Sequence, residues 1–300
     1  MGPVFIAGLD RSGKTYLRFM LSSGSSLAIS RRTDLWSRYY QKFGDLAQAD
    51  GLDRCLEALA VHKHIRSLNI DLARLRSDFE LGPRSYEHLF ALIHVQYAGL
   101  AGRARWGDQS ELLERYTEPI LAAYPDARIL QMLRDPRDRY QAVLQKSKRR
   151  GGVGVATARW LYSASLAEKY QQKFPEQYRV IRYEDMLREP EKTMKEICQF
   201  IGETYNPEML KMSDVPRFSG QQTQEEDLAL SPLSTAYIGQ FQEKLTGFEI
   251  AFIEHFSHRL MQHFGYGLEN NNPGFFRNLP GLALNAARLA GWRMIYTWSG

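Results

Sequence analysis

The segment GLDRSGKT at residues 8–15 constrains this chain more than any other part of its sequence. It is a glycine, four further residues and then Gly-Lys-Thr, which is the full pattern of a phosphate-binding P-loop. An apolar run, Val4–Ala7, precedes it, and Leu17, Met20 and Leu21 follow it with helical spacing. Because a strand, a glycine-rich loop and a helix follow one another, the loop amides and the helix N-terminus are expected to bind anionic oxygen. The sequence therefore predicts a phosphate site, whose ligand the motif alone leaves open.

The organisation of the chain is predicted to be a single domain over residues 1–300. The 300 residues are 44% hydrophobic and 24% charged, which is ordinary for a globular protein with a sizeable core. Length alone would suggest about two domains. No Pro/Gly/Ser-rich linker and no internal repeat divides the sequence. We therefore expect an α/β fold, a P-loop-like parallel sheet flanked by helices, with a helical insertion at 33–104 and an apolar C-terminal tail at 270–300.

Net charge and cysteine content limit the classes of ligand and partner that we expect. The net charge of +5 fits an anionic ligand, a nucleic acid or an anionic membrane surface. No basic stripe interleaved with aromatic residues is present, so no nucleic acid partner is expected. Of the two cysteines, Cys198 falls on the apolar stripe of an expected helix, which favours a buried free thiol. No Cys/His spacing suggests a metal site, and the absence of a signal peptide or long apolar run predicts a cytoplasmic protein.

A second strand is predicted at Arg128–Leu133, and the residues that follow it are Arg134, Asp135, Pro136, Arg137 and Asp138. A P-loop NTPase needs an acidic residue at such a strand end to help hold Mg²⁺. Here the first residue past the strand is Arg134, which at the carboxyl end of a parallel strand points toward the ligand crevice. A second phosphate group is its natural partner. Pairing of Arg134 with Asp135 or Asp138 to fix the turn is the alternative.

Three further stretches complete the pattern. Residues 178–186 predict a strand that runs into a polar turn, and Pro190 then opens a helix. Residues 106–109, Trp-Gly-Asp-Gln, read as a turn before another helix. Residues 246–249, Thr-Gly-Phe-Glu, form a capping box that opens a long helix near the end of the domain. Residues 151–154, Gly-Gly-Val-Gly, predict a loop.

The segments RSGKT, LRDPRD and RYEDMLREPEK, in that order, resemble the sulfotransferases that use 3′-phosphoadenosine 5′-phosphosulfate (PAPS), especially the bacterial and glycan-modifying branch. The resemblance covers residues 4–30, 105–146, 157–205 and 230–267. It implies a fold related to nucleotide kinases, with PAPS as cofactor and 3′-phosphoadenosine 5′-phosphate (PAP) as product. It also implies that the loop holds the 5′-phosphosulfate through Arg11, Ser12, Gly13, Lys14 and Thr15.

The same resemblance assigns the nucleotide end of the donor. Tyr16 falls where the family often has an aromatic residue against the adenine, Arg134 on the 3′-phosphate ligand, and Tyr183 in the family's Tyr-Glu-Asp turn. The family also has a serine ligand eight residues after the arginine, where this chain has Ala142. Arg217 is a candidate to compensate for it, or is a solvated loop residue.

Catalysis is expected to need no metal. Sulfuryl transfer is an in-line displacement in which the bridging oxygen of the donor leaves with growing negative charge, and fixed cations stabilise it. The family usually has Lys at the position of Arg11 and Thr at that of Lys14, so either cation could meet this oxygen. Lys14 could donate a proton to it, whereas Arg11 would act only through its charge.

The general base has several candidates. The resemblance places Asp108 near the acceptor, although an aspartate before a helix is often only an N-cap. His62 and His64 in the insertion and Glu111, just after Asp108, are the rivals.

The acceptor is predicted to be a small molecule or glycan that meets the insertion. The tail helix, expected within 279–298, would pack on the body, mediate self-association, or reach a membrane surface. The competing interpretations are a P-loop small-molecule kinase that uses Mg-ATP and a nucleotide-binding protein without activity.

Overall fold

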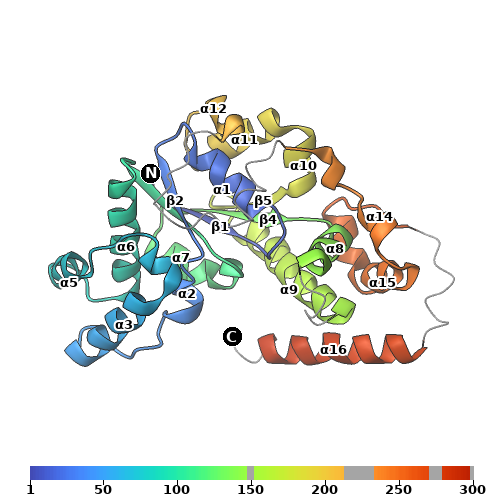
Figure 1. The fold of residues 1–300 in the computed structure, drawn as a ribbon, viewed down its shortest axis with the longest axis horizontal. Coiled ribbons are helices and arrows are strands. Elements are labelled where there is room, and N and C mark those ends of the chain that lie inside the picture. The colour runs from blue at the N-terminus through green and yellow to red at the C-terminus, as the bar shows by residue number, and fades with distance from the viewer. Residues whose placement is uncertain (147–151, 213–232, 270–278, 298–300) are drawn as a thin grey trace.

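The computed structural model describes residues 1–146, 152–212, 233–269 and 279–297. Its centre is a five-stranded parallel sheet in the order β2-β3-β1-β4-β5, with helices on both faces (Figure 1). The strands are β1 Val4–Ala7, β2 Leu27–Arg31, β3 Arg105–Gln109, β4 Arg128–Leu133 and β5 Tyr178–Arg182. The predicted fold class is confirmed.

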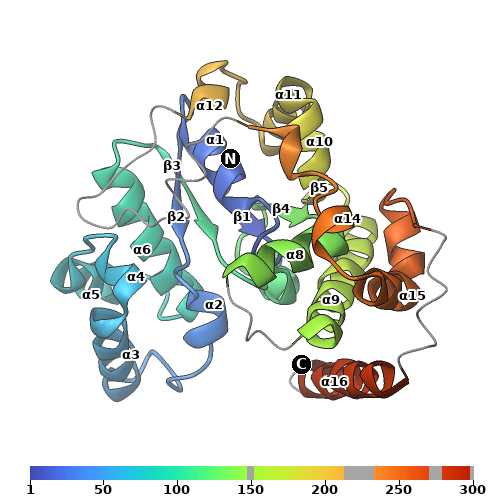
Figure 2. The same ribbon diagram turned by 45° about the vertical axis from the view of Figure 1, so that its right-hand side comes forward.

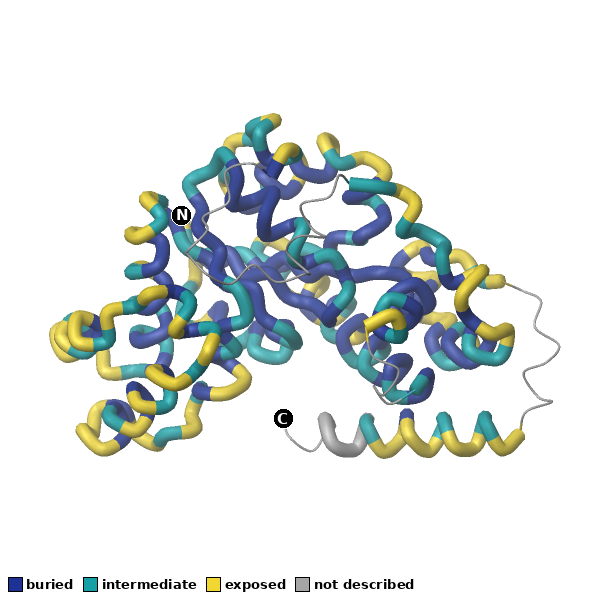
Figure 3. The backbone as a smooth tube through the Cα atoms, in the orientation of Figure 1, coloured by how far each residue is buried: buried dark blue, intermediate teal, exposed yellow. Residues whose placement is uncertain are grey.

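The central strand β1 shows why the sheet is buried on both sides. Val4 lies opposite Gly107 of β3 and Arg128 of β4, so β1 has a partner at each edge. Successive side chains of a strand point to opposite faces. Val4 and Ile6 accordingly belong to one hydrophobic core, and Phe5 and Ala7 to another. Figure 3 shows these strands as the buried centre of the molecule.

One face of the sheet is covered by the helix that follows the loop and by a helical group after β5. These helices are α1 Lys14–Ser22, α10 Tyr183–Arg188, α11 Pro190–Ile201 and α12 Glu208–Lys211. Pro190 opens α11 as predicted, and Gly202, at φ 74°, ends it in the left-handed conformation that glycine adopts readily. Cys198 is a buried free thiol in this core, which confirms its prediction.

The other face carries the helical insertion, which packs on Phe5 and Ala7. Its helices are α2 Leu35–Arg38, α3 Ala49–Val61, α4 Lys63–Arg66, α5 Leu72–Glu80 and α6 Tyr86–Leu100. α3 and α4 are separate helices, because His62 takes an extended conformation between them. After β3 the chain forms η1 Leu113–Tyr116 and α7 Thr117–Ala123.

A third core lies beyond β4 and β5. It is built by α8 Pro136–Lys146, α9 Gly152–Lys173, α14 Phe241–Lys244, α15 Gly247–His263 and α16 Leu279–Thr297, with η2 Thr235–Tyr237 before α14. Thr246 and Glu249 form the predicted capping box of α15, since the amide of Glu249 donates to the Thr246 hydroxyl and the Thr246 amide to the Glu249 carboxylate. The prediction of a loop at 151–154 is wrong for residues 152–154, because α9 begins at Gly152.

The predicted tail helix forms as α16 and packs along α9 (Figures 1 and 2). Within the described part of the chain, no helix is both long enough and apolar enough to cross a bilayer.

The segment Trp106–Gln109 is not a turn before a helix but part of β3, between β1 and β2. Gly107 lies so close to the backbone of Val4 that a Cβ at this position would collide with the Val4 carbonyl oxygen. The N-cap interpretation of Asp108 is therefore wrong, because Asp108 is a buried strand residue.

Candidate functional site

The loop at residues 8–15 connects the end of β1 to the start of α1, as its motif predicts. Gly8, Arg11 and Gly13 have φ angles of 114°, 64° and 92°, so the backbone turns repeatedly into the left-handed region. Such turns aim successive N–H groups into one concavity, which binds anions. A Cβ on Gly8 would collide with the Met132 carbonyl oxygen of β4, and one on Gly13 with the Tyr183 ring. Both glycines are therefore required by packing as well as by backbone conformation.

Lys14, the first residue of α1, is buried beneath the loop. Its ammonium donates to the Gly8 carbonyl oxygen at 2.5 Å and to the Ser110 carbonyl oxygen at 3.1 Å. Burial lowers the pKa of Lys14 from its usual value, and the carboxylates of Glu111 and Glu114 partly oppose that shift. An ammonium group has three donors, so two hold the protein and the third is left for a ligand.

Glu114 is a functional candidate that sequence reasoning missed. This fully buried carboxylate accepts the amide of Gly8 at 3.0 Å and the hydroxyl of Ser163 from α9. It therefore fixes the first glycine of the loop and adds negative charge near Lys14. No sequence signal distinguishes it from other glutamates, because its role depends on the packing of η1 against β1.

Arg134 lies at the carboxyl end of β4 and faces the loop, as predicted. Its guanidinium donates to the Arg11 carbonyl oxygen at 3.2 Å and to the Tyr237 carbonyl oxygen at 2.9 Å. It also lies over the Tyr183 ring, with its carbon 4.6 Å from the centroid. Only 7% of Arg134 is exposed, and its buried Nε has no hydrogen-bond partner. Among the described residues, this buried cation forms no ion pair with a carboxylate.

The acidic residues next to Arg134 have other partners. Asp135 binds Arg137 at 2.6 Å, and Arg137 also reaches Glu254 of α15 at 2.5 Å. Asp138 accepts the amides of Gly239 at 2.7 Å and Phe241 at 3.0 Å. The alternative in which Arg134 pairs with Asp135 or Asp138 is therefore wrong. Asp138 instead holds the segment that carries Tyr237 against the site.

The expected nucleotide-side aromatics meet at this point. The rings of Tyr16 and Tyr183 lie 6.5 Å apart, centroid to centroid. Burial raises the pKa of both phenols, and the nearby Tyr237 raises both values further. The structure thus brings together the loop, Tyr16, Arg134 and Tyr183.

Asp108 has a different environment from the one expected of a base in an open site. Its Oδ1 accepts the hydroxyls of Ser30 at 3.0 Å and Thr33 at 2.9 Å, and its Oδ2 accepts that of Ser110 at 3.0 Å. His94 lies on the same carboxylate, with Nε2 3.6 Å from Oδ1. The Asp108 side chain is completely buried. It thereby positions Ser110, whose carbonyl oxygen holds Lys14.

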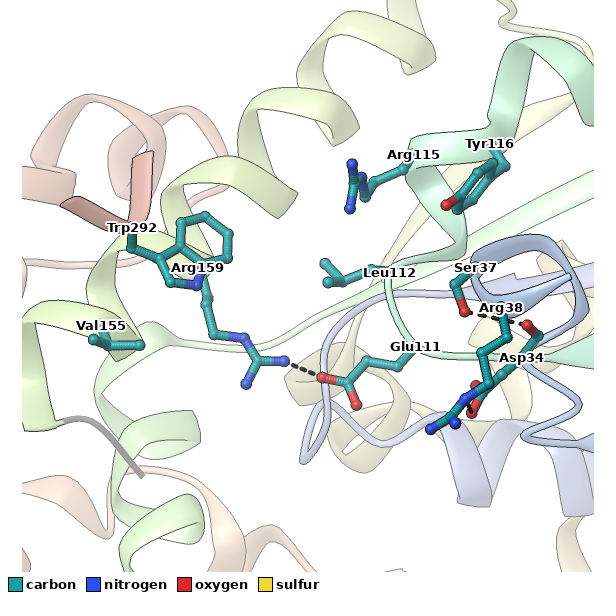
Figure 4. Close-up of a pocket in the computed structure, with 10 residues that line it drawn as sticks. All are labelled: Asp34, Ser37, Arg38, Glu111, Leu112, Arg115, Tyr116, Val155, Arg159 and Trp292. Atoms are coloured by element: carbon teal, nitrogen blue, oxygen red, sulfur yellow. Dashed lines mark hydrogen bonds and ion pairs between the residues drawn. The ribbon is translucent and has the colours of Figure 1, made fainter. Parts of the chain in front are cut away.

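A cleft of about 550 Å³ opens beside this point, between the insertion and α9 (Figure 4). Figure 4 shows Trp292, Val155 and Arg159 on one side and Asp34, Ser37, Arg38 and Tyr116 on the other, with Glu111 reaching across to Arg159. Glu111 follows Ser110 directly, and its charge acts on Lys14, so the cleft adjoins the end of the loop.

The remaining predicted residues lie elsewhere or cannot be placed. His62 and His64 meet edge to face in the insertion, with ring centroids 5.6 Å apart, and neither lines the cleft. Burial lowers the pKa of His64 to about 4, with help from Lys63 and Arg31. Ala142 is half-buried in α8. Arg217 lies outside the described residues.

With this geometry established, comparison with known proteins identifies the family. A model of the sulfotransferase family matches residues 3–207, which is more than half of the chain. The chain belongs to the sulfotransferase family. Its membership supports a sulfuryl transfer activity and confirms the resemblance of the three motifs.

Solved sulfotransferase structures share this fold at low sequence identity. The sulfotransferase domain from the Synechococcus PCC 7002 olefin synthase has a TM-score of 0.61 at 18% identity, covering 89% of this chain and 96% of that domain. The sulfotransferase domain from the curacin biosynthetic pathway has a TM-score of 0.58 at 19% identity, covering 89% and 98%. No curated protein matches the chain.

Proposed function

We propose that this sulfotransferase takes the sulfuryl group of PAPS and transfers it to a hydroxyl or amine by in-line displacement, without a metal ion. The observation that carries the proposal is the buried guanidinium of Arg134, which touches main-chain carbonyls and the Tyr183 ring beside the loop. A buried charge is costly unless it is paired. The carboxylates of Asp138 and Glu184 lie close enough to feel the charge of Arg134 but form no ion pair with it, and the 3′-phosphate of PAPS would supply a directly bonded anion.

A 3′-phosphate at Arg134 also determines where the 5′-phosphosulfate and the adenine of PAPS would lie. The 5′-phosphosulfate would lie on the N–H groups of residues 11–15, where the α1 N-terminus favours negative charge. Ser12 and Thr15 would add hydroxyl donors. The adenine would pack against Tyr16, which lies beside Tyr183 on the same side of the loop as Arg134. Arg217, beyond the described residues, remains a candidate for a further phosphate contact where the family serine is replaced by Ala142.

The bridging oxygen would be met by Lys14, with Arg11 contributing charge from the loop. Two of the three Lys14 donors are held by the Gly8 and Ser110 carbonyls, which aims the ammonium beneath the loop. The lowered pKa of Lys14 makes its ammonium a better acid. The S–O bond to the bridging oxygen would break as that oxygen takes the Lys14 proton, while the acceptor oxygen or nitrogen forms the new bond to sulfur.

Glu111 is the general base that we favour among the four candidates. It lines the cleft next to Lys14, and its side chain is 33% exposed, so it can meet an acceptor hydroxyl. Asp108 accepts three hydroxyl hydrogen bonds and is fully buried, which suits a positioning residue. His62 and His64 do not line the cleft.

The proposal is tested by calorimetric titration with PAP and with ATP, each with EDTA or with Mg²⁺. We expect tight binding of PAP in EDTA. Binding of Mg-ATP alone would instead support the small-molecule kinase, and binding of neither nucleotide would support a member of the family that has lost its activity. Release of PAP from PAPS in EDTA then tests the transfer step itself.

A further inference from the structure

The C-terminal helix α16, which lies outside the matched residues 3–207, forms part of the cleft next to the loop. Its inward face is marked by Leu282, Asn285, Leu289 and Trp292, which recur at helical spacing and are half-buried or buried. The other side of α16 is exposed (Figure 3). Leu284 is one of its exposed residues, at 53%. α16 is therefore docked in a defined orientation, and among its described side chains Trp292 lines the cleft.

α16 contacts α9 closely at two points. The amide of Gly154, in the first turn of α9, donates to Asn285 Oδ1 at 3.3 Å, and a Cβ on Gly154 would collide with the Asn285 carbonyl oxygen. Farther along, Trp292 meets Tyr162 of α9 edge to face, with centroids 5.7 Å apart and planes at 70°. Figure 4 shows the Trp292 side chain beside Arg159. Trp292 is thus a positioned ring at the edge of the cleft.

The charges of the cleft favour an anion. Its lining holds three guanidinium groups, Arg38, Arg115 and Arg159, and two carboxyl groups, Asp34 and Glu111. Glu111 pairs with Arg159, and Asp34 lies 3.4 Å from Arg38. Both carboxylates of the lining thus have an arginine partner within the lining itself. The lining therefore has an excess of positive charge.

We propose that the acceptor is an anionic ring compound, in which a sugar or aromatic ring stacks on Trp292 and a carboxylate, phosphate or sulfate meets the Arg38–Arg115 side of the cleft. This inference rests on the proposed function, because it assigns the cleft to the acceptor. A ring offers the flat surface that an indole binds, and guanidinium groups bind planar and tetrahedral oxyanions well. Trp292 then acts as a specificity-determining residue contributed by the tail.

Two matched pairs of probes test this class of acceptor. The pairs are 4-nitrophenyl β-D-glucuronide with the corresponding glucoside, and 4-hydroxyphenylacetate with its amide. Their binding is measured by calorimetry on the full chain saturated with PAP. We expect at least one acid to bind about tenfold more tightly than its neutral partner. Arg115→Gln should abolish that preference.

Substitutions in α16 isolate the contribution of Trp292. We expect Trp292→Ala to weaken both members of the preferred pair about tenfold and Trp292→Phe to retain most of the affinity. Leu284→Ala, on the outward face of α16, is the matched control and should change nothing. PAP affinity should be the same in all of these variants, which shows that the body of the protein is intact.

Equal affinity within both pairs, or no binding of any probe, would overturn the proposal, as would unchanged probe binding in Trp292→Ala. These failures leave PAP binding in place. Failure of the proposed function would instead be seen before any probe is added, as absent PAP binding.

Discussion

The guanidinium carbon of Arg134 lies 4.6 Å from the centroid of the Tyr183 ring, and that ring covers Gly13 so closely that a Cβ there would collide with it. Three segments far apart in the sequence therefore meet in one packed contact: the loop, the end of β4 and the start of α10. This contact fixes the position of the Arg134 guanidinium relative to the loop.

The first prediction concerns the charge of Arg134. Arg134→Ala should weaken PAP binding by about 3 kcal/mol, or about 100-fold in Kd, because a charge-assisted contact to the 3′-phosphate is lost. Calorimetry measures the change. Arg188→Ala, which removes an exposed arginine from α10, is the control and should leave the Kd unaltered. Wild-type affinity in Arg134→Ala would remove the assignment of the 3′-phosphate.

Lys14 provides a prediction about pH. If the Lys14 ammonium donates the proton to the leaving oxygen, kcat must fall as pH rises through its pKa, which burial lowers below the usual 10.5. Lys14→Arg keeps the charge but cannot release a proton in this range, so it should be slower and should lack this alkaline fall. The measurement is PAP release from PAPS between neutral and alkaline pH. If kcat falls identically at alkaline pH in both proteins, another group is responsible for that fall.

Replacing each carboxylate by its amide distinguishes the proposed base Glu111 from the positioning residue Asp108. Glu111→Gln should lower kcat by about 10²–10⁴, the usual contribution of a general base. It should lower the free energy of unfolding by at most about 1 kcal/mol, because only the partly exposed ion pair with Arg159 is lost. Asp108→Asn should lower stability instead, because an amide group replaces an oxygen that accepts a buried hydroxyl. Denaturant unfolding and PAP release together make the comparison. A stable Asp108→Asn variant that has lost all turnover would return the base to Asp108.

Glu184 gives a stability prediction with a definite sign. Burial raises the pKa of Glu184 to about 6 from 4.5, although the amide of Asp135 donates to its carboxylate. The native state therefore binds this proton more tightly than the unfolded state. Relative to Glu184→Gln, the wild type should gain about 2 kcal/mol in free energy of unfolding as pH falls from above 6 to below 4.5. Parallel pH dependence in the two proteins would contradict the shift.

The sequence predicted those parts of the site that depend on local patterns. The loop, the position of Arg134 after β4 and the cap of α15 each follow from neighbouring residues and from the rule that parallel strands end at one edge. β3 escaped prediction because Gly107, Asp108 and Gln109 lack the composition of a strand. Their burial depends on partners that only the fold supplies, such as Ser30 and Thr33 for Asp108.

The same reason explains the missed residues on the acceptor side. Glu114 and Trp292 owe their places to the packing of η1 on β1 and of α16 on α9, contacts between segments distant in the sequence. The helical spacing of Leu282, Asn285, Leu289 and Trp292 is visible in the sequence, but it does not say which element this face of α16 meets, and no motif surrounds Glu114. The pairing of Arg159 with Glu111 across the cleft is likewise visible only in the structure.

The most direct test of the central claim is a crystal structure of the full chain with PAP bound in EDTA. The account predicts the 5′-phosphate on the N–H groups of residues 11–15 with Lys14 beneath it, and the 3′-phosphate within hydrogen-bond distance of Arg134. A nucleotide bound in the opposite direction, or a 3′-phosphate remote from Arg134, would contradict it.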